Sequence, residues 1–532
     1  MSAGWTRMIR RDALRAKGRA VLRRGGKQIA LFHTADGVFA CNNRCPHEGY
    51  PLREGNLDGC ILTCNWHNWK FDLKTGANHF GGERLRVYPV ALRDGDIWLD
   101  LSDPPQDERR AAIMASLRDA FDDHAYDRIA REIARLRLAG GGAAGGGAAD
   151  AVIAAIGWSH ERFEYGWTHA YAGAADWLAL HDEHDGEPET QLVCLLESVG
   201  HMADDCLREG HYPYTENTRP YDEDAFVAAL EDEDEDLAVA YLRGGLDLGL
   251  GFARVERGLL RGALAHYANF GHSLIYTVKA GRLIERLGDG VAAPLLLSLT
   301  RSLVYARRED KIPEFRHYAQ ALADWGGGGT AGATLEPGDF AGLNAKNAMK
   351  LTSRHGAADG LALYGTLLAA NATHMLRYDM AYQNQIDGPI RDNVGWLDFT
   401  HAITFANAVR QTCAKYPELW PSGLLQMACF SGRNAAYTDA NLDDGRWRID
   451  DHEGFFESAI ETLFDHGRDE YIVSVHFLKT LLAAREELRA DPDGPAAAPL
   501  AAALHRLTHE TLKRKHTLRT ARQAMDFVAL DG

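Results

Sequence analysis

Residues Cys45-Pro46-His47 are followed, after sixteen intervening residues, by Cys64-Asn65-Trp66-His67, so two short segments each carry one cysteine and one histidine. Two thiolates can hold one iron of an iron–sulfur cluster while two neutral imidazoles hold the other. This mixed set raises the reduction potential above that of an all-thiolate cluster. Two cysteines and two histidines also suit a tetrahedral zinc ion, which is the alternative ligand.

The residues that surround these segments extend the pattern. CPHEGYPLREG (45–55) and CNWHNWKFDLKTG (64–76) resemble the two cluster-binding loops of Rieske ferredoxins and of the Rieske domains of oxygenases. The resemblance implies a 2Fe–2S cluster bound by Cys45, His47, Cys64 and His67. It also implies one-electron transfer, so the chemistry on a substrate is expected elsewhere in the chain.

One departure places the domain within the Rieske family. Tyr50 and Trp66 stand where high-potential Rieske proteins carry two further cysteines, which form a disulfide beside the cluster. Cys41 and Cys60 lie outside those positions. We therefore expect a cluster of the ferredoxin or oxygenase type, with a low potential and no loop disulfide.

Length and composition narrow the class of protein. A chain of 532 residues is expected to hold two or more domains, and 46% hydrophobic with 25% charged residues is typical of a soluble globular protein. The net charge of −17 argues against nucleic acid and anionic membranes as partners. Without a run of eighteen apolar residues we expect no membrane span. Eight cysteines in so long a chain indicate a reducing, cytoplasmic environment.

The pattern of the chain changes after residue 103. QIALFHTADGVFACNN (28–43) and RLRVYPVALRDGDIWLDL (84–101) alternate apolar and polar residues around Asp-Gly turns, which predicts β-hairpins in a small antiparallel domain spanning residues 1–103. From residue 104 onward apolar residues recur at helical spacing. We expect a large all-α domain over 104–532, interrupted by Gly-rich loops at 138–150 and 324–339.

Four segments of the helical region repeat one plan: an apolar helix, a turn rich in Gly, Pro and Asp, and a second apolar helix. This plan predicts stacked αα-hairpins. A histidine occurs near the start of each first helix, and another residue follows 32 or 33 positions later on the return helix. Hairpins stacked in register would bring these positions to one end of the array. The pairs are His169 with His201, His272 with Tyr305, His401 with Asn434, and His476 with His509.

Other side chains extend this candidate metal site. His374 has a similar sequence context, Glu197 lies four residues before His201, and Asp398 lies three before His401. Carboxylate and histidine side chains that project inward from helices form iron and manganese sites in helical bundles. Capping or packing is the alternative role for each histidine. Because a covalently attached electron donor needs an acceptor, we predict a second metal, iron, bound by a subset of His169, His201, His272, His374, His401, His476, His509, Glu197 and Asp398.

The helical region departs from the Rieske non-haem iron oxygenases. Their local signature is an acidic residue, two residues, His, four residues and His; Asp398 and His401 begin it, but Ala406 replaces the second histidine. THAITFANAVR (400–410) and the Gly/Thr-His helix starts are instead similar to the questin-oxidase-like family. That resemblance implies a helical oxidase or monooxygenase that uses O2 on polycyclic aromatic polyketides.

Together these observations predict a redox enzyme. A Rieske cluster would pass electrons to a His/carboxylate site of non-haem iron for O2-dependent oxidation of an organic, aromatic or polyketide-like small molecule. No Gly-x-Gly-x-x-Gly follows a predicted strand, so a separate ferredoxin or flavin reductase is expected as the electron donor. Two alternatives remain open: an electron-transfer protein whose helical domain docks a separate enzyme, and a redox sensor.

Overall fold

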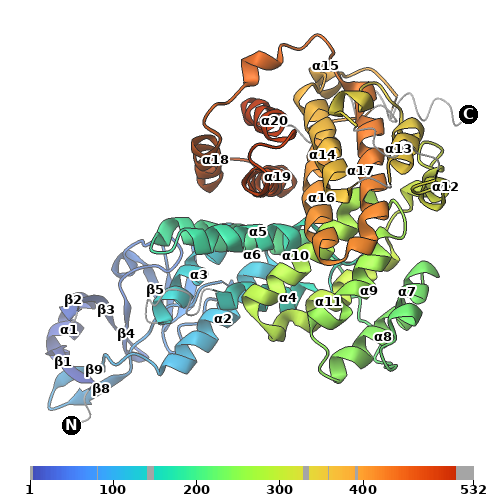
Figure 1. Ribbon diagram of the computed structural model, residues 1–532. Coiled ribbons are helices and arrows are strands. Elements are labelled where there is room, and N and C mark those ends of the chain that lie inside the picture. Colours follow the sequence, from blue (N-terminus) through green and yellow to red (C-terminus); the bar gives the residue numbers. More distant parts are fainter. Residues whose placement is uncertain are drawn as a thin grey trace, which may run out of the picture. The chain divides into compact units, whose positions relative to one another are not determined.

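The computed structural model describes residues 4–24, 26–80, 82–140, 149–327, 335–356, 359–389 and 393–510 (Figure 1). The chain forms two compact units, Met1–Gly142 and Ala143–Gly532. The first unit therefore extends past residue 103, where the β pattern ends, and includes two helices beyond that residue. Both Gly-rich stretches predicted as loops fall partly outside the described residues.

The strands of the first unit pair into three antiparallel sheets, ordered β1-β9-β8, β2-β3-β4 and β5-β6-β7. Both predicted hairpins are present. At the β8–β9 turn Asp94 and Gly95 have φ angles of 50° and 79°, which match the twist of a two-residue hairpin turn. The elements are β1 (Trp5–Arg10), α1 (Arg11–Lys17), β2 (Arg19–Arg24), β3 (Lys27–Thr34), β4 (Gly37–Asn42), β5 (Asn56–Asp58), β6 (Ile61–Thr63), β7 (Lys70–Asp72), β8 (Val90–Arg93) and β9 (Asp96–Asp100).

Helices α2 (Gln106–Asp122) and α3 (Tyr126–Ala139) pack against each other and complete the first unit. A buried ion pair connects α3 to the β-sheet region. The Glu83 side chain is 1% exposed, and both of its oxygens accept hydrogen bonds of 2.9 Å from the Arg131 guanidinium. Arg135 lies 2.9 Å from the same carboxylate. Glu83 thus attaches the α2–α3 pair to the strands.

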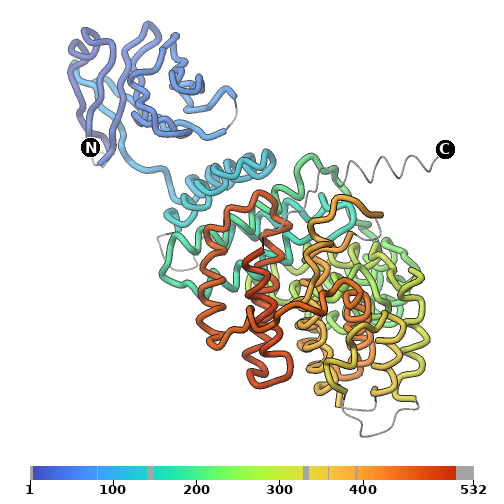
Figure 2. Tube along the Cα trace, turned by 90° about the horizontal axis from the view of Figure 1, so that it is seen from above, coloured from blue at the N-terminus to red at the C-terminus, as the bar shows by residue number. Residues whose placement is uncertain are grey.

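The regular secondary structure of the second unit is helical in its described residues, and the unit is coloured from cyan to red in Figure 2. None of the described helices is both long and apolar enough to cross a membrane. The helices are α4 (Ala149–Ser159), α5 (His169–Glu183), α6 (Pro188–Cys206), α7 (Glu223–Glu231), α8 (Glu235–Asp247), α9 (Phe252–Leu264), α10 (His272–Leu287), α11 (Ala292–Val304), α12 (Tyr318–Ala323), α13 (Ala345–Arg354), α14 (Gly360–Leu376), α15 (Met380–Asn384), α16 (Trp396–Lys415), α17 (Trp420–Asn434), α18 (His452–Glu461), α19 (Tyr471–Ala490) and α20 (Ala497–His509).

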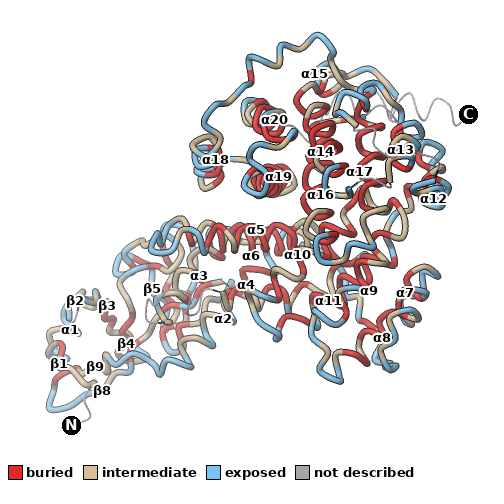
Figure 3. Tube along the Cα trace, viewed as in Figure 1, coloured by how far each residue is buried: buried red, intermediate tan, exposed pale blue. Residues whose placement is uncertain are grey.

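All four predicted αα-hairpins form, as α5–α6, α10–α11, α16–α17 and α19–α20. Their first helices contact one another in a closed cycle, in which α5 packs on α10, α10 on α16, α16 on α19 and α19 on α5. These helices are buried over much of their length (Figure 3). Gly173 permits close packing of α5 on α19, because a Cβ atom there would lie 2.7 Å from a Val475 methyl group.

Replacing Glu83 with alanine tests the attachment of the α2–α3 pair. Loss of its charge-assisted hydrogen bonds should lower the free energy of unfolding of the first unit by about 2 kcal/mol. The control is Glu54→Ala, which removes an exposed ion pair with Arg53 at 3.4 Å and should change stability by less than about 0.5 kcal/mol. Chemical denaturation measures both; equal effects would contradict this role of Glu83.

Candidate functional site

The two segments that carry the predicted cluster ligands form matching loops, one between β4 and β5 and the other between β6 and β7. In the first, the Cys45 amide donates to the Tyr50 carbonyl at 2.9 Å; in the second, the Cys64 amide donates to the Trp69 carbonyl at 2.8 Å. The fifth residue of each loop adopts a left-handed conformation, with φ of 80° at Gly49 and 59° at Asn68. The two loops thus have the same backbone hydrogen bond and the same left-handed residue, and they present their cysteines in equivalent positions.

The side chains in these loops fit a 2Fe–2S cluster. Cys45 and Cys64 are buried, and the Nδ1 atoms of His47 and His67 lie 3.2 Å apart. Burial, with a smaller contribution from the neighbouring Cys64, raises the pKa of the Cys45 thiol to about 11, while backbone N–H groups lower it. A bound metal ion would deprotonate both thiols. Two thiolates and two imidazole nitrogens are the mixed donor set of a Rieske centre.

Aromatic rings surround the two histidines. The Trp69 ring stacks on His47 at 4.3 Å and the Trp66 ring stacks on His67 at 5.1 Å. Tyr50 and Trp66 lie 6.0 Å apart by their ring centroids, at the positions where a loop disulfide would need cysteines. All eight cysteines of the chain are free.

A second cluster of histidines lies inside the helical unit. His169, His272, His401 and His476, one from each first helix of the four hairpins, form what we call the four-histidine cage. The Nε2 atom of His272 lies 3.2 Å from that of His169 and 2.9 Å from that of His401. The Nε2 atom of His476 lies 3.2 Å from that of His401. The rings of His476 and His169, 4.7 Å apart, complete the circuit.

The outer nitrogen of three cage histidines points to a backbone carbonyl. The Nδ1 atoms of His272, His401 and His476 lie 2.5, 2.6 and 2.5 Å from the carbonyl oxygens of Asn269, Leu397 and Ile472 respectively. A carbonyl only accepts hydrogen bonds, so each Nδ1 must carry the proton. On the fourth histidine, His169, the Nδ1 atom faces the Tyr276 hydroxyl at 3.5 Å.

Protonation at Nδ1 leaves a lone pair on Nε2 when the imidazole is neutral. The cage favours neutral imidazoles: burial, aided by the positive charge of Lys479, lowers the pKa of His272 to about 3 and holds those of His401 and His476 well below the usual value. Lone pairs that face one another at 2.9–3.2 Å repel unless a cation lies between them. Ring nitrogens of His169, His272 and His401 all lie within 4.8 Å of one another, so these three side chains could hold one metal ion, whereas His476 adjoins the group through His401.

A strained turn positions His272. Asn269, Phe270 and Gly271 all have positive φ, at 52°, 45° and 79°, a conformation that costs about 1–3 kcal/mol at each non-glycine residue and is found mainly at functional sites. The Asn269 amide donates to the Arg307 carbonyl at 2.8 Å. This turn aims the Asn269 carbonyl at the imidazole and places Phe270 beside the cage.

The carboxylate of Glu309 also supports the strained turn. It accepts a hydrogen bond of 3.3 Å from the Phe270 amide and is 2% exposed. Burial raises the pKa of Glu309 to about 7, although its backbone hydrogen bonds oppose the shift.

A cavity of about 130 Å³ lies against the cage. Two cage imidazoles, those of His272 and His401, form part of its wall. The other lining residues are apolar or belong to the start of α16 and the end of α17: Phe270, Leu397, Asp398, Phe430, Arg433 and Asn434. The cage is therefore accessible to a small molecule from one side.

A buried group of charged residues lies on three of the four cage helices, α5, α10 and α19. Lys479 follows His476 by three residues and is 2% exposed; burial lowers its pKa to about 7 against the attraction of Asp176. Lys279 donates to the buried Asp176 carboxylate. After burial, the positive charge of Lys479 is the next cause that lowers the pKa values of the cage imidazoles, so it helps to keep their nitrogens available as ligands.

The remaining candidate ligands lie outside the cage. His201 stacks on Tyr471 at 4.8 Å, and Glu197 lies 3.2 Å from the His466 imidazole. His374 is buried in α14, which is not one of the four cage helices. His509 is at the exposed end of α20, with its Nδ1 atom 2.9 Å from the His505 carbonyl.

Asp398 is near the cage but serves the start of α16. Its carboxylate accepts from the Gly395 amide at 2.9 Å and lies 3.4 Å from the Arg433 guanidinium. Of the return-helix positions, Asn434 lines the cavity and Tyr305 is half exposed.

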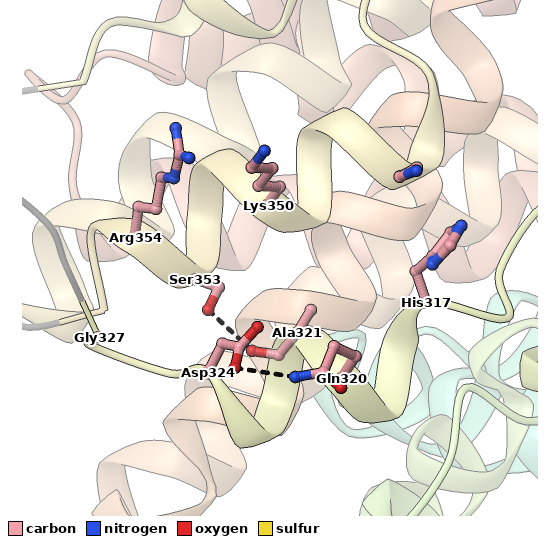
Figure 4. A pocket seen from close by; sticks show the side chains of 9 residues that line it. His317, Gln320, Ala321, Asp324, Gly327, Lys350, Ser353 and Arg354 are labelled. Atoms are coloured by element: carbon pink, nitrogen blue, oxygen red, sulfur yellow. Dashed lines mark hydrogen bonds between the residues drawn. The ribbon is translucent and has the colours of Figure 1, made fainter.

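The sequence did not single out Lys479 or Arg433. Lys479 follows the cage histidine His476 by three positions, so helical periodicity could have indicated it. A separate, basic pocket of about 350 Å³ lies on α12 and α13, with Lys350, Arg354 and His317 at its wall (Figure 4).

Comparison with known proteins assigns the first unit. The Rieske [2Fe-2S] domain family matches residues 4–88. The 3-phenylpropionate/cinnamic acid dioxygenase ferredoxin subunit of Photorhabdus laumondii is 36% identical over 78 residues, which are 14% of this chain and 74% of that protein. The protein therefore carries a Rieske-type electron-transfer domain, and through this domain the chain belongs to the Rieske [2Fe-2S] family.

Other relatives match the same region. The 4beta-methylsterol monooxygenase of Methylococcus capsulatus is 40% identical over 91 residues, but the match spans only 15% of this chain and 25% of the monooxygenase. Among solved structures, the ferredoxin of carbazole 1,9a-dioxygenase from Nocardioides aromaticivorans is matched over its full length and over 19% of this chain, with 22% identity and a TM-score of 0.18.

Removing one cysteine tests the ligand set. Cys64→Ala should abolish the visible absorbance and the EPR signal of the reduced cluster, because one iron loses a thiolate. Cys60→Ala removes a half-buried cysteine that lies outside both loops and should leave both signals intact. A Cys64→Ala protein that keeps the full cluster spectrum would contradict the assignment.

The raised pKa of Glu309 predicts a pH-dependent stability. Between about pH 4.5 and 7 the folded state holds a proton that the unfolded state has lost, so this contribution is full below the unfolded pKa and disappears as pH rises through about 7. In Glu309→Gln the contribution is constant. The urea midpoint of the variant should therefore rise relative to that of the native protein from pH 5 to 8; a pH-independent difference would contradict the raised pKa.

Proposed function

We propose that this protein is an oxidoreductase in which the Rieske domain delivers electrons to an iron ion held by the four-histidine cage. The reaction is the O2-dependent oxidation of a small organic molecule, of the monooxygenase or oxidase type. The observation that carries this proposal is the convergence of ring nitrogens from His169, His272 and His401 within 4.8 Å of one another, with His272 and His401 fixed as lone-pair donors by backbone carbonyls.

The choice of metal follows from the tethered electron donor. Neutral imidazoles suit zinc, copper, iron and nickel, and the geometry of the cage alone is compatible with each. A Rieske cluster supplies electrons singly when bound, so a redox-inactive zinc ion in the cage would leave them without an acceptor. Iron satisfies both the ligand set and the redox requirement.

The residues of the cage would orient and retain the metal. The carbonyls of Asn269, Leu397 and Ile472 hold the imidazole rings in position and increase their basicity, as second-sphere partners of metal-bound histidines do. Each carbonyl belongs to the turn of backbone just before its histidine, so the orientation is built into the helix starts. The cavity beside His272 and His401 leaves one side open for reactants.

Reduction of O2 consumes protons as well as electrons. Burial lowers the pKa of Lys479 to about 7, so its Nζ atom can both take up and release a proton near neutral pH. It is buried within the same helices as the cage, with Asp176 and Lys279 nearby. Lys479 is therefore the residue best suited to hold a proton for the reaction.

A separate reductase would supply the electrons. Several relatives of the Rieske domain are ferredoxin subunits of dioxygenase systems, which supports electron transfer from another protein. The imidazoles of His47 and His67 are 26% and 37% exposed, so this edge of the first unit is open to a ferredoxin or flavin reductase.

Iron content tests the proposal on the full chain. The native protein should contain about three iron atoms per chain, two in the cluster and one in the cage. The double variant His272→Ala, His401→Ala should retain about two, because two lone pairs no longer hold the cage metal, and should keep the EPR signal of the cluster.

His201→Ala is the matched control, since His201 lies outside the cage and should leave about three iron atoms in place. A native protein with only cluster iron and an empty or zinc-filled cage would contradict the proposal and favour the role of an electron carrier.

A further inference from the structure

We propose that the cavity beside the cage binds an organic substrate as a ring-sized apolar group and orients it through one hydrogen-bond-accepting oxygen, a carbonyl or a phenolate. Asn434 and Arg433 would donate the hydrogen bonds to that oxygen. The inference deepens the proposed function and rests on it for the identity of the reacting metal, but substrate binding is measurable by itself.

The strongest evidence is the amide of Asn434. This residue ends α17, is 1% exposed and lines the cavity. Both its Oδ1 and its Nδ2 atoms are buried without a hydrogen-bond partner. A buried amide with no partner destabilises a fold, and such groups occur where a ligand supplies the missing bond.

Arg433 has a free donor at the same wall. Its Nη2 atom lies 3.4 Å from the Asp398 carboxylate, which in turn accepts from the Gly395 amide, so the guanidinium is held at one end. Its Nη1 atom is buried without a hydrogen-bond partner. The guanidinium lies over the Phe270 ring at 5.4 Å, which fixes its plane beside the cavity.

The size and the other walls of the cavity indicate the apolar part of the ligand. Phe270, Leu397 and Phe430 provide apolar surface. Its volume of about 130 Å³ is close to that of an engineered apolar cavity of about 150 Å³ that binds benzene. A single six-membered ring therefore fits, and the imidazoles of His272 and His401 place that ring against the cage.

The charges select the polar part of the ligand. Two donors at the same cavity, the Asn434 amide and the Arg433 guanidinium, favour a ligand that carries a hydrogen-bond acceptor. Asp398 offsets the charge of Arg433, so the wall does not favour a multiply charged group such as a phosphate. A neutral carbonyl or a singly charged phenolate matches this balance.

Fluorine NMR on the full chain tests the inference with three probes of similar size. 4-Fluoroacetophenone carries a carbonyl, 4-fluorophenol carries a phenolic hydroxyl that can bind as the phenolate, and 4-fluorotoluene has no oxygen. We expect the first or the second probe to bind at least about tenfold more tightly than 4-fluorotoluene, since each 1.4 kcal/mol of interaction is a tenfold change in affinity. Which of the two binds better identifies the oxygen. Equal affinities for all three, or no binding, would overturn the proposal.

Variants of α17 locate the binding. Asn434→Leu should weaken the preferred oxygen-bearing probe about tenfold and raise the thermal midpoint, because it removes an unpaired buried amide. Ser431→Ala is the matched control: it also removes a buried, unpartnered polar group from α17, but Ser431 does not line the cavity. Unchanged probe affinity in Asn434→Leu, or a lowered midpoint, would show a structural role and overturn the assignment.

Iron content measured on the same samples separates the two proposals. Asn434→Leu should keep the native amount of iron while it loses the probe, which places the effect on the substrate side of the cavity. Arg433→Lys, which keeps the charge beside Asp398, should weaken the probe without unfolding the protein. If the native cage holds no iron but the oxygen-bearing probe still binds as predicted, the proposed function fails and the pocket assignment stands.

Discussion

The structure of the helical unit depends on the orientation of buried imidazoles. Three backbone carbonyls each accept the Nδ1 proton of a cage histidine, and this forces the opposite nitrogens to present lone pairs to one another at 2.9–3.2 Å. Such an arrangement is unfavourable in an apolar interior without a cation. Burial and the charge of Lys479 increase the constraint, since both lower the pKa values of the imidazoles and so suppress the protonation that would otherwise satisfy one of the nitrogens.

The hairpin repeat brings the four imidazoles together. Four copies of one helical plan place one histidine each on α5, α10, α16 and α19, and the closed cycle of contacts between these helices brings the four together. The copies are not identical. His169 and His272 are the first residues of their helices, whereas His401 and His476 lie one turn or more inside theirs. For His401 and His476, the carbonyl comes from the preceding turn of the same helix. His272 has no preceding helical turn, and the strained turn before it supplies the Asn269 carbonyl instead.

Much of this architecture could be predicted from the sequence. Spacing and neighbouring residues predicted the loops around Cys45 and Cys64, and helical periodicity predicted all four hairpins. The repeated position of the first-helix histidines indicated the members of the cage. Sequence spacing gives the position of a residue along the axis of a hairpin but not the direction in which its side chain faces. For this reason it did not separate these four histidines from His201 and His509, which lie at similar positions along their hairpins but face Tyr471 and His505.

Other features depend on contacts between distant segments. The positive φ values at Asn269 and Phe270 occur where the segment after α11 forms a hydrogen bond to the turn. No local sequence motif predicts them. The cavity forms where this turn meets the start of α16 and the end of α17. The unpaired amide of Asn434 and the free donor of Arg433 become visible only when these three segments are placed together.

The central claim is that the cage binds iron through imidazole nitrogen alone. Iron-edge X-ray absorption on the full-length Cys64→Ala protein tests it most directly, since that variant lacks the cluster and leaves the cage iron as the absorber. The account predicts residual iron with a first shell of nitrogen or oxygen neighbours, an imidazole scattering pattern and no sulfur. A protein without residual iron, or iron with sulfur neighbours or without imidazole scattering, would contradict it.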